Sequence, residues 1–352
     1  MSALHVQEGI PQPEPVSPYL KYKRKQKLSA DSYLSGILAG DRVVLSQAIT
    51  LIESTTQRDI EIAEQIIAGC LPHAGNAVRI GITGVPGVGK SSFIETFGKY
   101  LTSIGKKVAV LAVDPSSEFS KGSILGDKTR MEELSIDPNA FIRPSPSGLT
   151  LGGVARKTRE TIILCEAAGF DTIIIETVGV GQSETVVKSM VDFFLLLMLA
   201  GAGDELQGIK RGIMEMADAI IITKADGDNM PQATAAKALY QSALHLFQRN
   251  ENGWIPPVGT CSIYQKDTIQ NIWKIISDFE THTKKNGYFL KHRSEQSVKT
   301  FYEWMNDLLT ARFYANATVE KKINQLTADI KKGNISPYQA GTKLLREYGA
   351  LQ

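Results

Sequence analysis

The chain has 352 residues, of which 43% are apolar and 22% are charged, an ordinary globular composition that excludes a disordered, collagen-like or fibrous protein. Its 39 lysines and arginines against 37 acids leave a net charge of +2, so the charge balance gives no reason to expect a nucleic-acid partner. The longest apolar run, Phe193 to Ala200, is too short to cross a bilayer, so we expect neither a membrane segment nor a membrane partner.

The three cysteines are far apart in the chain and form no CxxC pair. Their spacing excludes a disulfide scaffold or a local zinc site and suits a reducing compartment. Residues 1–28 are rich in proline and end in a basic run, so we interpret them as a mobile arm. The basic run can steer an acidic partner or can simply be solvated. This start shows no organelle address, and we expect a cytoplasmic protein.

Residues 29–76 predict a small helical unit, because apolar residues recur there at helical spacing. From 77 to 283, short apolar runs alternate with amphipathic stretches, which predicts an α/β domain with a doubly wound, mostly parallel sheet. The predicted strands are Val78–Thr83, Val108–Val113, Thr172–Ile175, Phe193–Leu199, Ala219–Thr223 and Val258–Ile263, and the predicted helices are Ser91–Ser103, Val154–Ala168, Gln232–Gln248 and Thr268–Glu280. Residues 284–352 return to helical spacing and predict a helical arm, which packs on its own domain or forms a partner surface.

The strongest motif lies between the first predicted strand and the helix after it, and reads GVPGVGKS, the full GxxxxGK(S/T) pattern. Its glycines let backbone N–H groups point at phosphate oxygens, Lys90 can reach the β- and γ-phosphates, and Ser91 can ligate Mg²⁺. The alternative, a glycine-rich turn with a surface lysine, is disfavoured by the strand and helix on either side. The predicted phosphate loop consists of Gly84, Val85, Pro86, Gly87, Val88, Gly89, Lys90 and Ser91.

Two acids stand at the carboxyl ends of neighbouring predicted strands, where open parallel sheets bind ligands. Asp114 ends one run and Glu176 ends another. Each carboxylate can hold Mg²⁺ directly or through water, and Gly179 can offer its N–H to a γ-phosphate. Each acid can instead be a helix cap or a surface charge. The glycines after Glu176 would let this loop reorganise when the γ-phosphate leaves.

A candidate base reader, Thr223-Lys224-Ala225-Asp226, follows the next predicted strand. The carboxylate of Asp226 can accept hydrogen bonds from N1–H and the exocyclic amine of guanine, whereas adenine presents an acceptor at N1. The KxD pattern is weak alone, but its position supports it. Ser262 and Ile263 follow the last predicted strand, where a backbone N–H can meet the guanine O6. We therefore expect GTP or GDP with Mg²⁺ as the ligands.

Beyond these motifs, residues 29–283 resemble the P-loop GTPases that act as accessory proteins of adenosylcobalamin-dependent methylmalonyl-CoA mutase, a family with the older label LAO/AO transport system kinase. The resemblance implies a GTPase core with a C-terminal helical arm for homodimerisation. It also implies a chaperone whose GTP binding and hydrolysis gate cobalamin loading and protection of the mutase. The matching stretches are GITGVPGVGKSSFIE, VLAVDPSS, GSILGDKTRM, FIRPSPS, LGGVARKTRE, ETVGVGQSE and AGAGDELQGIKRGIMEMAD.

The resemblance also assigns roles to particular residues. It extends the phosphate loop to Ser92 and places Asp114, Asp127 and Glu176 around magnesium and the attacking water. Asp226 matches the guanine reader. The stretch Gly201–Lys210 resembles a further mobile switch, although a plain strand-to-helix turn remains the alternative. The switch residues implied in this stretch are Asp204, Glu205 and Lys210.

Three departures from the family pattern stand out. Thr223 replaces the asparagine of most GTPases, so a side-chain contact to the base or the phosphate loop is lost or is replaced by a hydroxyl. Ser120-Lys121 interrupts a stretch that is usually Thr-Gly-Gly, which puts a bulky cation in a predicted switch. Cys261 and Ile263 replace smaller residues around Ser262, a change that a backbone contact tolerates.

The predicted catalytic residues are Lys90, Asp114, Asp127 and Glu176. No arginine finger is evident, so we expect a low intrinsic rate. The arginines that remain open as suppliers of transition-state charge are Arg130, Arg143, Arg156 and Arg159.

Three rivals remain. A nickel metallochaperone of the same class would need a His- or Cys-rich segment, which the sequence lacks. An ATP-dependent kinase would bind ATP as well as GTP. A nucleotide-gated scaffold would release no phosphate. The sequence has no DxHxxG cobalamin loop, so we expect any cobalamin to belong mainly to the partner.

Overall fold

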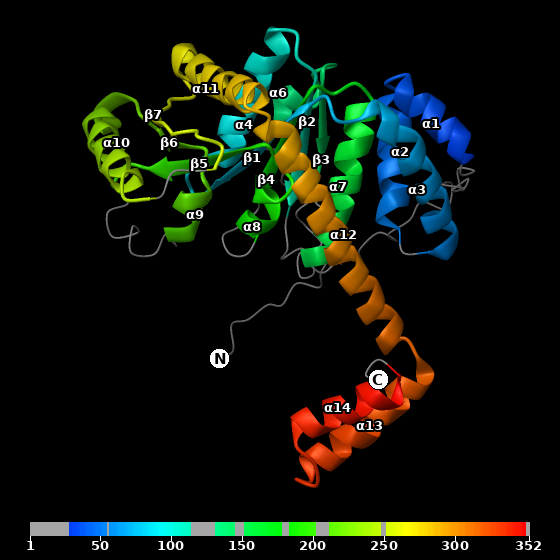
Figure 1. The fold of residues 1–352 in the computed structure, drawn as a ribbon. Coiled ribbons are helices and arrows are strands. Elements are labelled where there is room, and N and C mark those ends of the chain that lie inside the picture. Colours follow the sequence, from blue (N-terminus) through cyan, green and yellow to red (C-terminus); the bar gives the residue numbers. More distant parts are fainter. Residues whose placement is uncertain are drawn as a thin grey trace, which may run out of the picture.

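The computed structural model describes residues 28–54, 56–113, 131–144, 151–177, 183–201, 211–247 and 251–349. Its centre is a seven-stranded sheet in the order β3-β2-β4-β1-β5-β6-β7, in which all paired strands are parallel. The strands are β1 (Val78–Gly84), β2 (Val108–Val113), β3 (Ala140–Arg143), β4 (Thr172–Thr177), β5 (Phe193–Leu199), β6 (Ala219–Thr223) and β7 (Val258–Thr260). Helices cover both faces of the sheet (Figure 1), so the predicted doubly wound fold is confirmed.

The strands are mainly apolar because both faces of the sheet are covered. On β4, for example, Ile173 and Ile175 belong to the core on one face and Ile174 to the core on the other. The helices that complete the domain are α4 (Lys90–Ser103), α6 (Glu132–Ser135), α7 (Leu151–Ala167), α8 (Ser183–Lys188), α9 (Arg211–Met216), α10 (Met230–Leu244) and α11 (Lys266–Lys285), with 3-10 turns η1 (Leu71–His73) and η2 (Gly227–Asn229).

The N-terminal helices form an additional layer outside α7 (Figure 1). They are α1 (Ala30–Leu38), α2 (Arg42–Glu53) and α3 (Gln57–Cys70), and α2 is capped by the Asp41 carboxylate, which accepts from the N–H groups of Val43 and Val44. Their fully buried side chains, such as Ile49 and Ile66, join the same apolar cluster as the sheet residue Ile173. These helices therefore share one core with the sheet.

The sequence analysis did not predict the edge strand β3. Its apolar run is only Ala140–Ile142, and Pro144 follows it closely, so the local pattern is too short to distinguish from a loop. Pairing with β2 makes it a strand, with Val108 opposite Ala140 and Val110 opposite Ile142. Because this pairing is non-local, only the tertiary structure could reveal it.

Beyond the sheet domain the chain forms a helical arm of α12 (Tyr288–Tyr314), α13 (Ala317–Lys331) and α14 (Pro337–Glu347). Figure 1 shows α12 leaving the sheet domain and carrying α13 and α14 well away from it. Within the described residues no helix is both long enough and apolar enough to cross a membrane. Several large apolar side chains on α12 are exposed, among them Leu290, Val298, Phe301, Tyr302, Met305 and Leu309.

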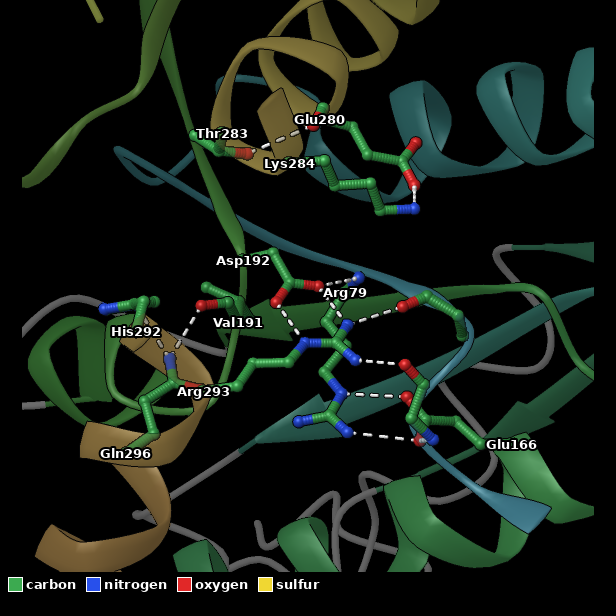
Figure 2. A network of polar contacts seen from close by, with 12 residues as sticks. Arg79, Glu166, Val191, Asp192, Glu280, Thr283, Lys284, His292, Arg293 and Gln296 are labelled. Carbon is green, nitrogen blue, oxygen red and sulfur yellow. Dashed lines mark hydrogen bonds and ion pairs between the residues drawn. The ribbon is translucent and has the colours of Figure 1, made fainter. Parts of the chain in front are cut away.

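The base of the arm is joined to the sheet by the buried network of Figure 2. Arg293 of α12 donates to both carboxylate oxygens of Asp192, at 2.7 and 2.6 Å, and to the carbonyl oxygens of Gly75 and Ala77. The backbone N–H of Arg79 also donates to Asp192 (2.8 Å). Asp192, Ala77 and Arg79 lie just before or at the start of their strands, so this joint closes the amino edge of the sheet.

Candidate nucleotide-binding site

The predicted phosphate loop lies at the carboxyl end of β1 and leads directly into α4. A side chain at Gly84 would place its Cβ only 2.4 Å from the carbonyl oxygen of Leu197 on β5, so only glycine fits there. Val88 is buried in the core and anchors the middle of the loop. Gly89 then takes a positive φ of 89° before the first residue of α4. The loop is thus held against the sheet at both ends, with the helix N-terminus directed at its mouth.

Lys90 folds back across this loop, and its Nζ donates to the carbonyl oxygen of Gly84 at 2.8 Å. Partial burial lowers the pKa of its ammonium from the ordinary 10.5, and the carboxylates of Glu176 and Glu184 oppose that shift. The buried Glu184 thus belongs to the electrostatic surroundings of Lys90. An anionic phosphate would stabilise the same ammonium, so Lys90 is suited to exchange its carbonyl partner for a phosphate oxygen.

Ser91 and Glu176 meet at the place predicted for magnesium. The Ser91 hydroxyl donates to Oε1 of Glu176 at 3.4 Å, and Glu176 is buried at the end of β4. Beside them the hydroxyls of Thr83 and Thr177 are hydrogen-bonded at 2.9 Å, which ties the ends of β1 and β4 together. A hydroxyl and a carboxylate are the hard oxygen donors that Mg²⁺ takes together with phosphate oxygens and water, so the residues present fit this ion.

The base-reading end is assembled from the loops after β6 and β7. Asp226 follows β6, and its Oδ2 accepts a hydrogen bond from the hydroxyl of Ser262 at 2.5 Å. No other described residue donates to the second oxygen, Oδ1. Of the backbone N–H groups of residues 262–265, only that of Ile263 lacks a partner among the described residues. An acceptor pair and a neighbouring N–H donor match the edge of guanine, which presents two donors beside O6.

Thr223 ties the base-reading end to the phosphate loop. Its hydroxyl lies 2.8 Å from the carbonyl oxygen of Val88 and 3.2 Å from that of Met198. The neighbouring Lys224 donates from Nζ to the carbonyl oxygen of Gly87 at 2.8 Å. Of the two outcomes expected for the departure from asparagine, loss of the contact or its replacement by a hydroxyl, the structure shows the replacement, because the Thr223 hydroxyl contacts the phosphate loop.

Several predicted site residues lie outside the described residues, so the structure gives no position for them. They are Asp114, Asp127, Gly179, Asp204, Glu205 and Lys210. The structure brings together the remaining ones in two clusters, the phosphate end around Lys90, Ser91 and Glu176, and the base end around Lys224 and Asp226. Both clusters lie on the carboxyl edge of the sheet.

The candidate arginines that the structure describes are engaged by helices away from the phosphate loop. Arg143 forms an ion pair with Glu53 of α2. The Arg156 guanidinium stacks on the ring of Trp304 in the arm, with its carbon 3.6 Å from the ring centroid. Arg159 donates to Glu303 of the arm at 3.0 Å. In this structure these three residues hold the N-terminal helices and the arm in place, while Arg130 is not described.

Sequence reasoning did not single out Glu184 or recognise the contacts of Thr223. Glu184 follows Glu176 by eight positions, and no spacing rule brings an acid at that distance back to Lys90. The packing of α8, which carries Glu184, against β4 does so. The signal for Thr223 was its departure from the asparagine pattern, but the hydroxyl's acceptors on two other elements were not readable from the chain.

A GxxxxGKS loop between a parallel strand and its helix, with an acid at the end of the neighbouring strand and a carboxylate base reader, defines a P-loop GTPase. A family model described as Methylmalonyl Co-A mutase-associated GTPase MeaB matches residues 45–318. GTPase ArgK of Escherichia coli strain K12 is 46% identical over 309 residues, which cover 88% of this chain and 93% of that protein. The mitochondrial methylmalonic aciduria type A homolog of Mus musculus is 43% identical over 334 residues, covering 92% and 80%.

A solved structure supports the same assignment. The crystal structure of LAO/AO transport system kinase superposes with a TM-score of 0.73 and 38% identity, covering 91% of this chain and 97% of that one. The chain belongs to the MeaB family of methylmalonyl-CoA mutase-associated GTPases.

Proposed function

We propose that this protein is a GTP-hydrolysing chaperone that gates adenosylcobalamin loading and protection of methylmalonyl-CoA mutase or a related acyl-CoA mutase. The observation that carries the proposal is that the phosphate loop and the base-reading residues lie at the same edge of the sheet. The donors and acceptors around Asp226 match those of guanine, and Thr223 connects this end of the site to the phosphate loop. Membership of a family named for association with the mutase supports the choice of partner.

In the proposed mechanism the chain acts mainly by positioning charge. Asp226 and the N–H of Ile263 orient the base, and the loop N–H groups hold the phosphates. Lys90 turns from the Gly84 carbonyl to the β- and γ-phosphate oxygens and stabilises the negative charge that develops there. Bound Mg²⁺, held by Ser91 and Glu176, would supply further charge neutralisation.

The attacking water is assigned to the acids that the family resemblance places around it, Asp114 and Asp127. The γ-phosphate state would reach the mutase through the loop after Glu176 and through Asp204, Glu205 and Lys210. Loss of the γ-phosphate removes the phosphate oxygens that hold such loops through hydrogen bonds. GTP hydrolysis would thereby change the surface that these loops present to the mutase.

We also propose that the protein is a homodimer formed through the arm. The support is the row of exposed apolar side chains on α12 described above, since such rows on an otherwise polar helix are covered in most soluble proteins. Size-exclusion chromatography with light scattering would test it. A monomer at micromolar concentration would contradict this part of the proposal.

The decisive experiment mixes the full chain with a candidate mutase and follows co-elution and phosphate release from GTP together. The wild type should co-elute with the mutase in a nucleotide-dependent manner and release phosphate. Lys90→Ala is the matched control, in which turnover should fall by about 10³-fold or more because the charge opposite the γ-phosphate is lost. Undiminished turnover in this variant would remove the phosphate loop from the mechanism, and absence of any association would overturn the chaperone role.

A further inference from the structure

An exposed aromatic residue stands directly beside the base reader. Tyr264 is 83% exposed, although a tyrosine buries much of its ring in most folded settings. Its backbone N–H donates to the Ser262 hydroxyl at 3.2 Å, and that hydroxyl donates to Asp226 at 2.5 Å. Within the described part of the chain its ring makes no aromatic or cation contact. The backbone of Tyr264 is thus held two hydrogen bonds from the carboxylate that reads the base.

Lys224 borders the same site where it meets the phosphate loop. This residue has a positive φ of 54°, and the Asn229 side chain fixes that turn by donating to the Lys224 carbonyl oxygen at 2.6 Å. Its Nζ is held by the carbonyl oxygen of Gly87, so the aliphatic stem spans from the base-reading loop to the phosphate loop. A flat ring that reaches Asp226 with its edge would lie along this stem with one face.

The Lys224 stem would cover only one face of a bound base, so the other face is left to be covered. We propose that Tyr264 stacks on the guanine held by Asp226, so that the base lies between the tyrosine ring and the Lys224 stem. The inference rests on the proposed nucleotide site and adds a residue that determines affinity for the base. Stacking is tolerant of base identity because every purine has a π-face, whereas selectivity stays with the hydrogen bonds at the base edge.

The stack makes a quantitative prediction for GDP affinity, measured by calorimetry on the full chain. Tyr264→Ala should weaken GDP binding by about tenfold, near the lower end of the range for loss of one base–aromatic stack. Tyr264→Phe should bind GDP as the wild type does, because the ring remains. Tyr338→Ala is the matched control, since Tyr338 is also strongly exposed but lies on α14 of the arm. It should leave GDP affinity unchanged.

A second variant reports the contact directly. In Tyr264→Trp the new indole should be quenched when GDP binds and should not respond to inorganic triphosphate, which has phosphates but no base. The wild type, with Trp254, Trp273 and Trp304, supplies the background signal. Base-dependent quenching together with the tenfold loss in Tyr264→Ala would support the stack.

The outcomes separate this inference from the proposed function. Wild-type affinity for GDP in Tyr264→Ala, or quenching by inorganic triphosphate equal to that by GDP, would overturn the stack while leaving the GTPase intact. Failure of the wild type itself to bind GDP would overturn the proposed site first. An equal loss of GDP and inorganic triphosphate affinity in Tyr264→Ala would also overturn the stack, because it would mark a general distortion of the loop.

Discussion

The two edges of the sheet are finished in opposite ways. At the amino edge, Arg293 and Asp192 form an ion pair with side chains only 11% and 4% exposed, so their charges are neutralised inside the protein. At the carboxyl edge, Lys90 and Lys224 donate to loop carbonyl oxygens, and Asp226 keeps one oxygen without a described donor. Internal pairing makes the first edge a structural joint. Exchangeable partners make the second edge a binding site.

The largest expected effect breaks the carboxyl edge alone. Asp226→Asn should weaken GTP binding by about 10³-fold or more, because an amide N–H₂ would face the donors of guanine. The same amide can donate to the O2 of xanthine, so XTP affinity should rise in this variant. Calorimetry with both nucleotides measures the change. Retained preference for GTP would show that Asp226 does not read the base.

The next effect breaks the amino edge. Arg293→Ala leaves Asp192 buried without its main counter-ion and two carbonyl oxygens without a donor, and should cost about 3–5 kcal/mol in the free energy of unfolding. GDP affinity of the folded protein should change little. Urea unfolding with and without GDP measures both quantities.

The matched control for that variant is Lys291→Ala, two positions before Arg293 on α12. Lys291 pairs with Glu295 at 3.7 Å, but both side chains are more than half exposed. Its removal should change the free energy of unfolding by less than about 0.5 kcal/mol. Equal losses in the two variants would contradict the view that burial makes the amino edge a joint.

A smaller effect tests the tie between base and phosphate loop. Thr223→Val keeps the shape of the side chain but removes the hydroxyl that contacts the carbonyl oxygens of Val88 and Met198. These buried carbonyl oxygens then lose their hydrogen-bond donor, at a cost of about 1–2 kcal/mol. We expect GDP affinity to fall about fivefold to thirtyfold. Thr223→Ser should restore it. A loss in the serine variant as large as in valine would assign the effect to packing.

The smallest effect is a pH dependence at the arm joint. Burial, and secondarily Lys188, lowers the pKa of His292 below its ordinary 6.5, against the opposing charges of Asp192, Asp218 and Glu295. The folded state therefore favours the neutral imidazole, so this contribution to stability is complete above about pH 6.5 and declines as the pH falls through the lowered pKa. Unfolding free energies of the wild type and His292→Phe between about pH 5.5 and about pH 7.5 would show it. Identical slopes in the two proteins would refute the assignment.

The sequence by itself determined six of the seven strands of the described sheet and the positions of the phosphate loop and of Asp226 after their strands. Apolar runs of strand length predicted six strands, and the order of elements placed Lys90, Glu176 and Asp226 at strand ends. Both inferences succeed because hydrophobic period and turn chemistry are local properties of the chain. The family resemblance then rested on whole stretches of sequence.

Only the tertiary structure decided which distant groups meet. The network at the amino edge joins residues that are far apart in the chain, since Arg79 lies more than 80 residues from both Glu166 and Asp192, and Arg293 lies more than 80 residues from all three. No local pattern pairs one buried charge with another. The same holds for Thr223 and Val88, for Arg156 and Trp304, and for the pairing that makes β3 a strand. Long-range contacts depend on how helices and strands pack, and many pairings of like residue types are compatible with one sequence pattern until the fold selects among them.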